Sequence, residues 1–126
     1  MAAPNIVNIT TLTGKTTYVN LTTTGSTSIL SNPIGSNKVY KINSLLVSNT
    51  DTANAIAITA NYYDSSSMID ATTSGSLAGS VTISAKSNFV ILDKTTAIYL
   101  EENKSIGATA NSASKLTVIC SYEDIG

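Results

Sequence analysis

The sequence predicts an all-β protein with one antiparallel sandwich or barrel. Apolar and polar residues alternate with a period of two in many segments, the spacing of strands with one buried face. No window keeps the apolar stripe of an amphipathic helix, and turn residues recur about every 8 to 12 residues, as in sandwiches and barrels. The 126 residues fit one structural domain. We divide it into residues 1–30, a Thr-rich arm or edge strands, and residues 31–126, the β-sandwich.

The amino-terminal segment has runs of threonine between its apolar residues, which favours extended structure over helix. Two interpretations stay open for its strand: pairing with a neighbouring molecule, or an edge position in the same sandwich. Ile6, Val7 and Ile9 are too apolar for a free tail. Because Pro4 and the threonines oppose a helix that folds back, we expect residues 1–11 to form an extended arm that contacts another chain.

The strand predicted over residues 38–49 is apolar on both faces. Leu45 and Val47 fall on the opposite face from Ile42, so either a bulge near residues 43–44 shifts the register or both faces are buried.

Residues 89–92 are also apolar on both faces. Because a sandwich of this size has one interior, such strands indicate burial against a second subunit, although a bulge with ordinary surface exposure also explains them. The predicted contact residues in these two strands are Leu45, Val47, Val90 and Leu92.

The clearest strand covers residues 55–63, where Ile56, Ile58, Ala60 and Tyr62 share one face. Residues 65–80 contain two glycines and no strong strand pattern, so we expect a long connection that crosses between sheets. Further strands are predicted around alternating sets: Val81, Ile83 and Ala85; Phe89 and Ile91; Ile98 and Leu100; Leu116, Val118 and Cys120.

The composition argues against most chemical functions. Charged residues make up 12% of the chain, the formal net charge is −1, and histidine and tryptophan are absent. Nucleic acid and anionic membranes are therefore disfavoured as partners, and the usual general base and zinc ligands are missing. We expect no catalytic, cofactor-binding or metal-binding residues and no enzymatic activity. The single Cys120 is expected to be a buried, inert thiol.

A few polar and aromatic side chains are candidates for a chemical site. Asp64 and Asp70 flank a serine run that suits Ca²⁺ only weakly, since the ligand spacing of an EF-hand loop is missing. Glu101 and Glu102 with Asp93 suggest a carboxylate pair for glycoside hydrolysis, but such acids usually belong to solvated turns. Tyr63, beside Asp64, is a candidate for stacking on a sugar.

Four stretches carry a resemblance to a known family. They are Met-Ala-Ala-Pro-Asn-Ile-Val-Asn-Ile-Thr at residues 1–10, Lys-Ile-Asn-Ser-Leu-Leu-Val-Ser-Asn at 41–49, Ile-Tyr-Leu-Glu-Glu-Asn-Lys-Ser-Ile at 98–106, and Leu-Thr-Val-Ile-Cys-Ser-Tyr-Glu at 116–123. With these the chain resembles small virion proteins of tailed phages, particularly short structural proteins of cyanophages. The Gly-Asp usual in the family's Leu-Glu turn is replaced here by Asn103-Lys104, and its arginine after Ser-Ile by Gly107.

The resemblance implies a jelly-roll-like sandwich, a homotrimer, and a bacteriophage capsid decoration or cement protein that binds the major capsid protein. Its expected place is the outside of the virion, after synthesis in the host cytoplasm. The arm residues Ile6, Val7 and Ile9 would then contact the capsid or a neighbouring subunit. The alternative function is a neck-, tail- or fibre-associated module that binds a receptor or a glycan.

Overall fold

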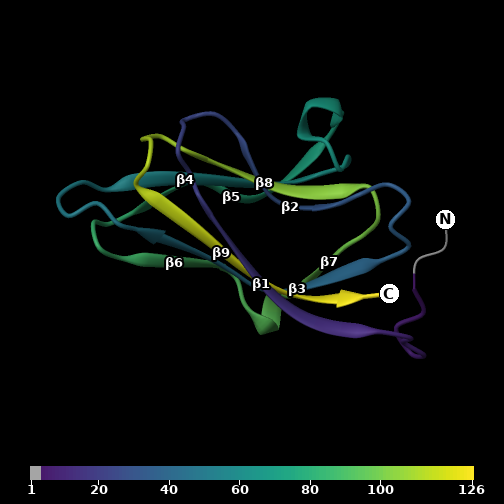
Figure 1. The fold of residues 1–126 in the computed structure, drawn as a ribbon. Coiled ribbons are helices and arrows are strands. Elements are labelled where there is room, and N and C mark those ends of the chain that lie inside the picture. Colours follow the sequence, from purple (N-terminus) through teal and green to yellow (C-terminus); the bar gives the residue numbers. More distant parts are fainter. Residues whose placement is uncertain (1–3) are drawn as a thin grey trace.

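Two antiparallel sheets packed face to face form the computed structural model, which describes residues 4–126 (Figure 1). The first sheet has the order β1, β9, β3 and β6, with β7 also paired to β3, and the second has the order β2, β8, β4 and β5. The strands are β1 (Leu12–Asn20), β2 (Thr27–Asn32), β3 (Val39–Asn49), β4 (Ile56–Tyr63), β5 (Ser74–Ile83), β6 (Asn88–Leu92), β7 (Ile98–Leu100), β8 (Lys104–Ala110) and β9 (Leu116–Ile125).

Helical structure in the described residues is limited to two single 3₁₀ turns, η1 (Met68–Asp70) and η2 (Lys94–Thr96). The all-β prediction is therefore confirmed. None of the helical segments in residues 4–126 has the length and hydropathy needed to cross a membrane.

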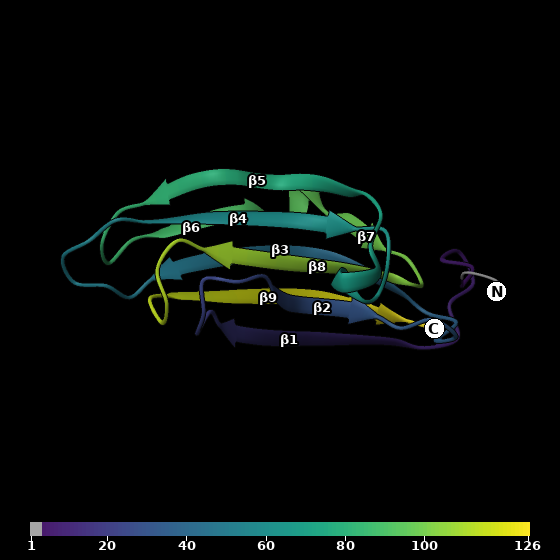
Figure 2. The ribbon, with the colours of Figure 1, turned by 90° about the horizontal axis from the view of Figure 1, so that it is seen from above.

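The order of the strands is that of a jelly roll, which joins two Greek keys in two sheets. Every connection between successive strands passes from one sheet to the other, except β4 to β5 and β6 to β7. Figure 2 shows one group of loops at one end of the sandwich and the chain termini at the other. The end that holds the termini consists of residues 4–11, the loops 33–38, 64–73 and 101–103, and Gly126. We call it the terminal end.

The core lies between the two sheets and follows the predicted alternation. In β4 the residues at 56, 58 and 60 are buried, and in β9 those at 116, 118 and 120. The sheets contribute in equal measure, with Ile58 and Ile106 from one sheet meeting Leu45 and Val118 from the other in one apolar cluster. Folding is therefore driven by burial of these inner faces.

A bulge in β3 explains why this strand is apolar on both faces. The pairing of β3 with β9 shifts register between Ile42 and Ser44, so Asn43 is the extra residue. Ile42 and Leu45 consequently point to the same side, into the core, where both are fully buried. The predicted bulge is confirmed.

The bulge also corrects three of the predicted contact residues. Leu45, Val47 and Leu92 are buried in the core of their own chain and are not available at the surface. A second register shift, between β3 and β6, places Leu92 opposite Leu45 on the inside and Val90 opposite Leu46 on the outside. Of the four residues predicted from these strands, only Val90 is exposed.

The expectation for residues 65–80 is wrong, because β5 begins at Ser74. This strand lies at the edge of its sheet and pairs with β4 alone, through a register with two shifts. Such a strand contributes few side chains to the core, which is why small residues suffice and no clear alternation appears. The segment 64–73 joins two neighbours in the same sheet and does not cross between sheets.

Both amino-terminal strands belong to the sandwich. β1 is an edge of the first sheet, paired with β9, and β2 is an edge of the second, paired with β8. Residues 4–9 do not form an extended arm: the amide of Asn8 donates to the carbonyl of Asn5, which closes a turn. The segment folds back on its own domain, and residues 1–3 of the expected arm lie outside the described residues.

We expect Cys120 to react with a thiol reagent only after the chain unfolds. Its side chain is fully buried, and burial raises the pKa of the thiol to about 12. Since the thiolate is the reactive form, the folded protein should stay unlabelled while the denatured protein reacts completely. The measurement is the rate of labelling by a chromogenic disulfide reagent with and without denaturant. Rapid stoichiometric labelling of the folded protein would contradict the burial.

Candidate functional site

Of the two carboxylates considered for metal binding, Asp64 has a structural task. Asp64 accepts hydrogen bonds from the hydroxyls of Thr72 and Thr73, at 2.7 and 2.8 Å, and from the amide of Thr72. These bonds hold the pKa of Asp64 well below its usual range. Asp64 thus closes the loop 64–73. In the described part of the chain no three His, Cys, Asp or Glu side chains gather as a metal site would require.

Two of the three acids considered for glycoside hydrolysis, Asp93 and Glu102, have separate hydrogen-bond partners. Asp93 caps the turn η2 by accepting from Thr95 and Thr96, and the hydroxyl and amide of Thr95 lower its pKa. Glu102 accepts from the backbone amides of Gly35 and Asn37, both at 3.0 Å. Because Asp93 and Glu102 are engaged by donors in different loops, these two carboxylates do not form a paired acid and base.

Tyr63 is covered on one side by its own chain. It packs over Gly107, where a Cβ would lie 2.9 Å from the ring atom Cε2 and would also meet Sδ of Met68. The glycine at 107 is therefore required by the close approach of Tyr63 and Met68, which hold η1 over the outer face of the second sheet. Packing accounts for this tyrosine, and the ring pair found among residues 4–126, Tyr40 with Tyr122, does not include it.

Three loops of the terminal end are fastened to one another by buried or half-buried polar side chains. Glu102 binds the loop 33–38, as described above. Asn103 accepts from the amide and hydroxyl of Ser66, at 3.1 and 2.9 Å, and so binds the loop 64–73. Asn32 is fully buried and donates to the carbonyls of Lys38 and Leu100. We call Asn32, Glu102 and Asn103 the loop clamp.

The loop clamp includes part of the turn that carries the family resemblance. Asn103 has a φ of 59°, a conformation that favours glycine and that asparagine tolerates best among other residues. Ser105, fully buried, donates to the carbonyl of Ser65 at 2.7 Å. The turn at 101–103 thus holds the loops 33–38 and 64–73 in place through hydrogen bonds.

Apolar side chains project into solvent from two of these ordered loops and from the amino-terminal segment. Val7, Ile34 and Ile69 are 92, 72 and 94% exposed, and each lies on a different segment of the terminal end. Large exposed apolar residues on loops whose conformation is already fixed are typical of a contact surface, because little ordering entropy is lost on binding. We therefore take the terminal end as the candidate functional site.

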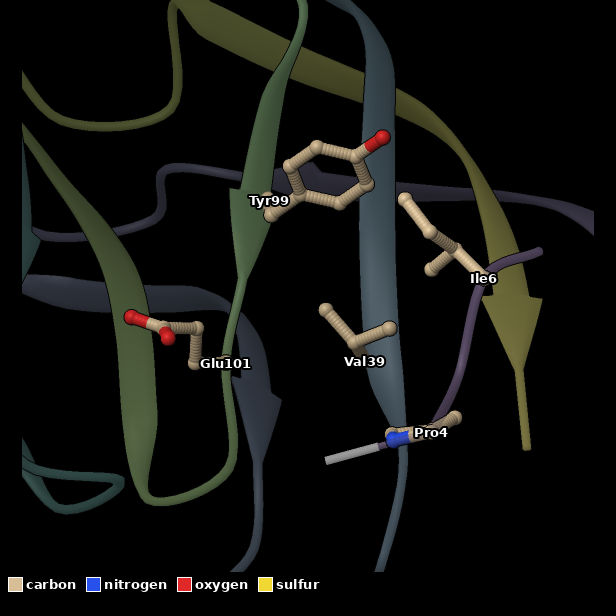
Figure 3. A pocket seen from close by; sticks show the side chains of 5 residues that line it. All are labelled: Pro4, Ile6, Val39, Tyr99 and Glu101. Carbon is tan, nitrogen blue, oxygen red and sulfur yellow. The ribbon is translucent and has the colours of Figure 1, made fainter. Parts of the chain in front are cut away.

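The amino-terminal segment adds a shallow pocket of about 400 Å³ to this end. Figure 3 shows Ile6 beside the strand that carries Val39, with Tyr99 above, Pro4 below and Glu101 to the left. Four of the five lining side chains are apolar or aromatic, and the single acid stands at the side. The pocket has room for an apolar side chain of a partner but no convergent set of polar groups.

The remaining predicted contact residues lie in two places. Ile6 and Val7 are exposed at the terminal end, and Ile9 is half-buried there. Val90 stands on the outer face of the first sheet, in a row of paired residues with Leu46, Ile119 and Tyr18. Whether these residues contact another chain stays a prediction.

The residues missed by sequence reasoning are Ile34, Ile69 and Asn32. Ile34 sits between proline and glycine, and Ile69 comes after a serine run and Met68, so each is a large apolar residue inside a turn. That contrast is a usable signal for a surface contact. Asn32 gives no such signal, because only the fold reveals that the loops 33–38 and 101–103 both bond to it.

Comparisons with known proteins give a partial likeness. No family model matches the chain, and no curated protein matches it. A chain of the T13 infectious bursal disease virus particle aligns with a TM-score of 0.43 at 7% identity, and a chain of the cyanophage Pam1 capsid asymmetric unit with 0.37 at 15%. The alignments cover 89 and 99% of this chain, and 31 and 91% of those chains.

A chain of the infectious bursal disease virus Gx strain aligns with a TM-score of 0.31 at 10% identity, over 90% of this chain and 40% of that one. The present chain thus spans about a third of the length of the first virus chain. At these scores the likeness is partial and does not assign a function.

Proposed function

We propose that this chain is a non-enzymatic virion structural protein, most specifically a decoration or cement protein that binds the capsid lattice from outside. The observation that carries the proposal is the terminal end, where fixed loops expose Ile34 and Ile69 and the amino-terminal segment exposes Val7. The resemblance of four sequence stretches to small phage virion proteins supports it, as does the jelly-roll topology, which viral capsid domains use among other proteins.

Such a protein works through contact area. The exposed side chains at the terminal end would pack against the major capsid protein and tie adjacent subunits together. Few charges and many hydroxyl side chains suit a permanent, hydrated interface better than a steered encounter. A contact of a few kcal/mol for each copy suffices, because it is repeated over the shell. The resemblance implies a trimer, and this stoichiometry stays a prediction.

The test is add-back to capsids that lack the protein, scored as copies bound per particle. The double variant Ile34→Ser and Ile69→Ser should bind about 100-fold more weakly, since each buried isoleucine contributes roughly 1.5 kcal/mol or more. The fold should be unchanged, because neither side chain contacts the core. The matched control is Val90→Ser, an exposed apolar residue on the outer face of the first sheet.

Two outcomes contradict the proposal. If the double variant occupies particles as fully as the wild type, the terminal end is not the contact surface. If virions contain only a few copies, confined to the tail, the receptor- or glycan-binding alternative replaces decoration. A copy number that scales with the capsomers supports the proposal.

A further inference from the structure

The edge of the first sheet formed by β1 presents a regular row of backbone groups. Thr11 and Gly126 exchange both backbone hydrogen bonds, and the amide of Leu21 donates to Leu116. The register between these points is unbroken. In an antiparallel pair, hydrogen-bonded residues alternate along the strand. The odd-numbered residues of β1 therefore bind β9, and the even-numbered ones point their amides and carbonyls outward: Leu12, Gly14, Thr16, Tyr18 and Asn20.

The other sheet edges are interrupted in ways that discourage pairing with another chain. β2 is short and its register shifts between Ser28 and Leu30. β5 pairs with two shifts and contains Ser80 at a φ of 54°. The opposite edge of the first sheet is broken by η2 between β6 and β7. Bulges, short strands and breaks are the usual protection of edges, and β1 has none of them.

The single charge on β1 does not protect its edge. A lysine commonly keeps an edge strand from pairing by presenting its charge to solvent. Here Nζ of Lys15 binds the carboxylate of Asp124 at 2.9 Å, and Lys38 binds the same carboxylate at 3.3 Å. Lys15 is thus held within its own chain, on the face away from Tyr18, and leaves the edge open to a second strand.

We propose that two copies of this chain pair through their β1 strands, antiparallel, about a two-fold axis at Thr16. Thr16 is the central residue of β1, so full overlap of the two strands places it opposite Thr16 of the second copy. The same register places Gly14 of each copy opposite Tyr18 of the other. All these residues are even-numbered, so the free amides and carbonyls of each strand meet those of the other.

Side chains on the outer face fit the same register. The ring of Tyr18 is 70% exposed, whereas the position that a Cβ would take at Gly14 has no atom within 4 Å. In the pair, each tyrosine ring would cover the glycine of the facing strand, an arrangement known to stabilise glycine in sheets. The axis repeats this contact twice. A second copy therefore fits the edge better than an unrelated peptide.

The pairing extends the first sheet of each copy into one continuous sheet across the axis. It does not depend on a virion role. One β1 edge accepts one partner strand, so this contact forms dimers. A trimer requires a different surface.

The experiment introduces a charged side chain at Thr16 and measures the molar mass of the protein in solution by light scattering. The wild-type chain of 13.0 kDa should have twice its mass in solution. Thr16→Glu and Thr16→Lys should each be monomers, since like charges would face each other directly. An equal mixture of the two should regain the double mass, because the charges are then opposite. Thr16 is exposed, so both variants should keep the wild-type circular dichroism spectrum.

The matched control is Ser76→Glu, an exposed hydroxyl residue on the edge strand β5, which should remain a dimer. Hydrogen exchange gives a second readout: the amides of Gly14, Thr16 and Tyr18 should be protected in the wild type and exposed in Thr16→Glu. A monomeric wild type, unprotected amides at these positions, or an oligomer that both Thr16 variants leave intact would overturn the proposal.

Discussion

Leu45→Ala is expected to lower the free energy of unfolding by about 3 to 4 kcal/mol, the range for a leucine removed from a rigid core. Leu45 is fully buried and faces Leu92 and Cys120 across the neighbouring strands. The cavity left by the missing side chain cannot be filled by these neighbours without distorting the bulge at Asn43. Urea denaturation followed by circular dichroism measures the change.

The control for this prediction is Val90→Ala in the adjacent strand. Val90 is half-exposed, so its loss should change stability by less than about 1 kcal/mol. The mass in solution should be unchanged for Leu45→Ala at temperatures where it is folded. A variant with wild-type stability and altered self-association would instead make Leu45 the subunit contact that its sequence pattern suggested.

Asn32→Leu is expected to lower the free energy of unfolding by about 3 kcal/mol, because it leaves two buried carbonyls without donors. These are the carbonyls of Lys38 and Leu100, at 2.9 and 3.0 Å from Nδ2 of Asn32. The loss should also free the loops of the terminal end. Hydrogen exchange should accelerate at the amides of Gly35 and Asn37, which the loop clamp holds through Glu102.

Asn49→Leu is the matched variant at the opposite end of the sandwich. Asn49 is buried and donates to the carbonyls of Asn54 and Ile83, so a similar loss of stability is expected. Exchange at Gly35 and Asn37 should stay at its wild-type rate in this variant. If both variants accelerate these amides equally, the effect is general loosening and Asn32 has no specific hold on the terminal end.

Alternation predicts the regular strands of this fold and fails at the irregular ones. β4, and β9 as far as Cys120, each have one core face, and their buried residues follow the period of two that the sequence displays. In β3 the bulge at Asn43 places Leu45 on the same face as Ile42. A strict period of two residues therefore assigns Leu45 to the wrong face. β5 lies at an edge with small residues, where burial imposes no pattern.

The candidate site was less predictable, because its order comes from contacts distant in sequence. Glu102 reaches the loop 33–38, and Asn103 reaches Ser66, so neither role follows from neighbouring residues. The left-handed conformation of Asn103 explains why glycine is usual at this position of the similar family. Residues that the resemblance singled out as a turn are therefore positioning residues for loops that the sequence alone leaves unconnected.

The position of β9 between β1 and β3 has a consequence for synthesis of the chain. Leu12 near the start pairs with Ile125 near the end, and Val39 pairs with the same residue from the other side. A nascent chain on the ribosome lacks the central strand of the first sheet until residues 116–125 have emerged. The first sheet therefore forms only after β9 has been made, at the slow rate typical of non-local β pairing. Until then the inner faces of β1 and β3 stay uncovered, which makes the incomplete chain the form most prone to aggregate.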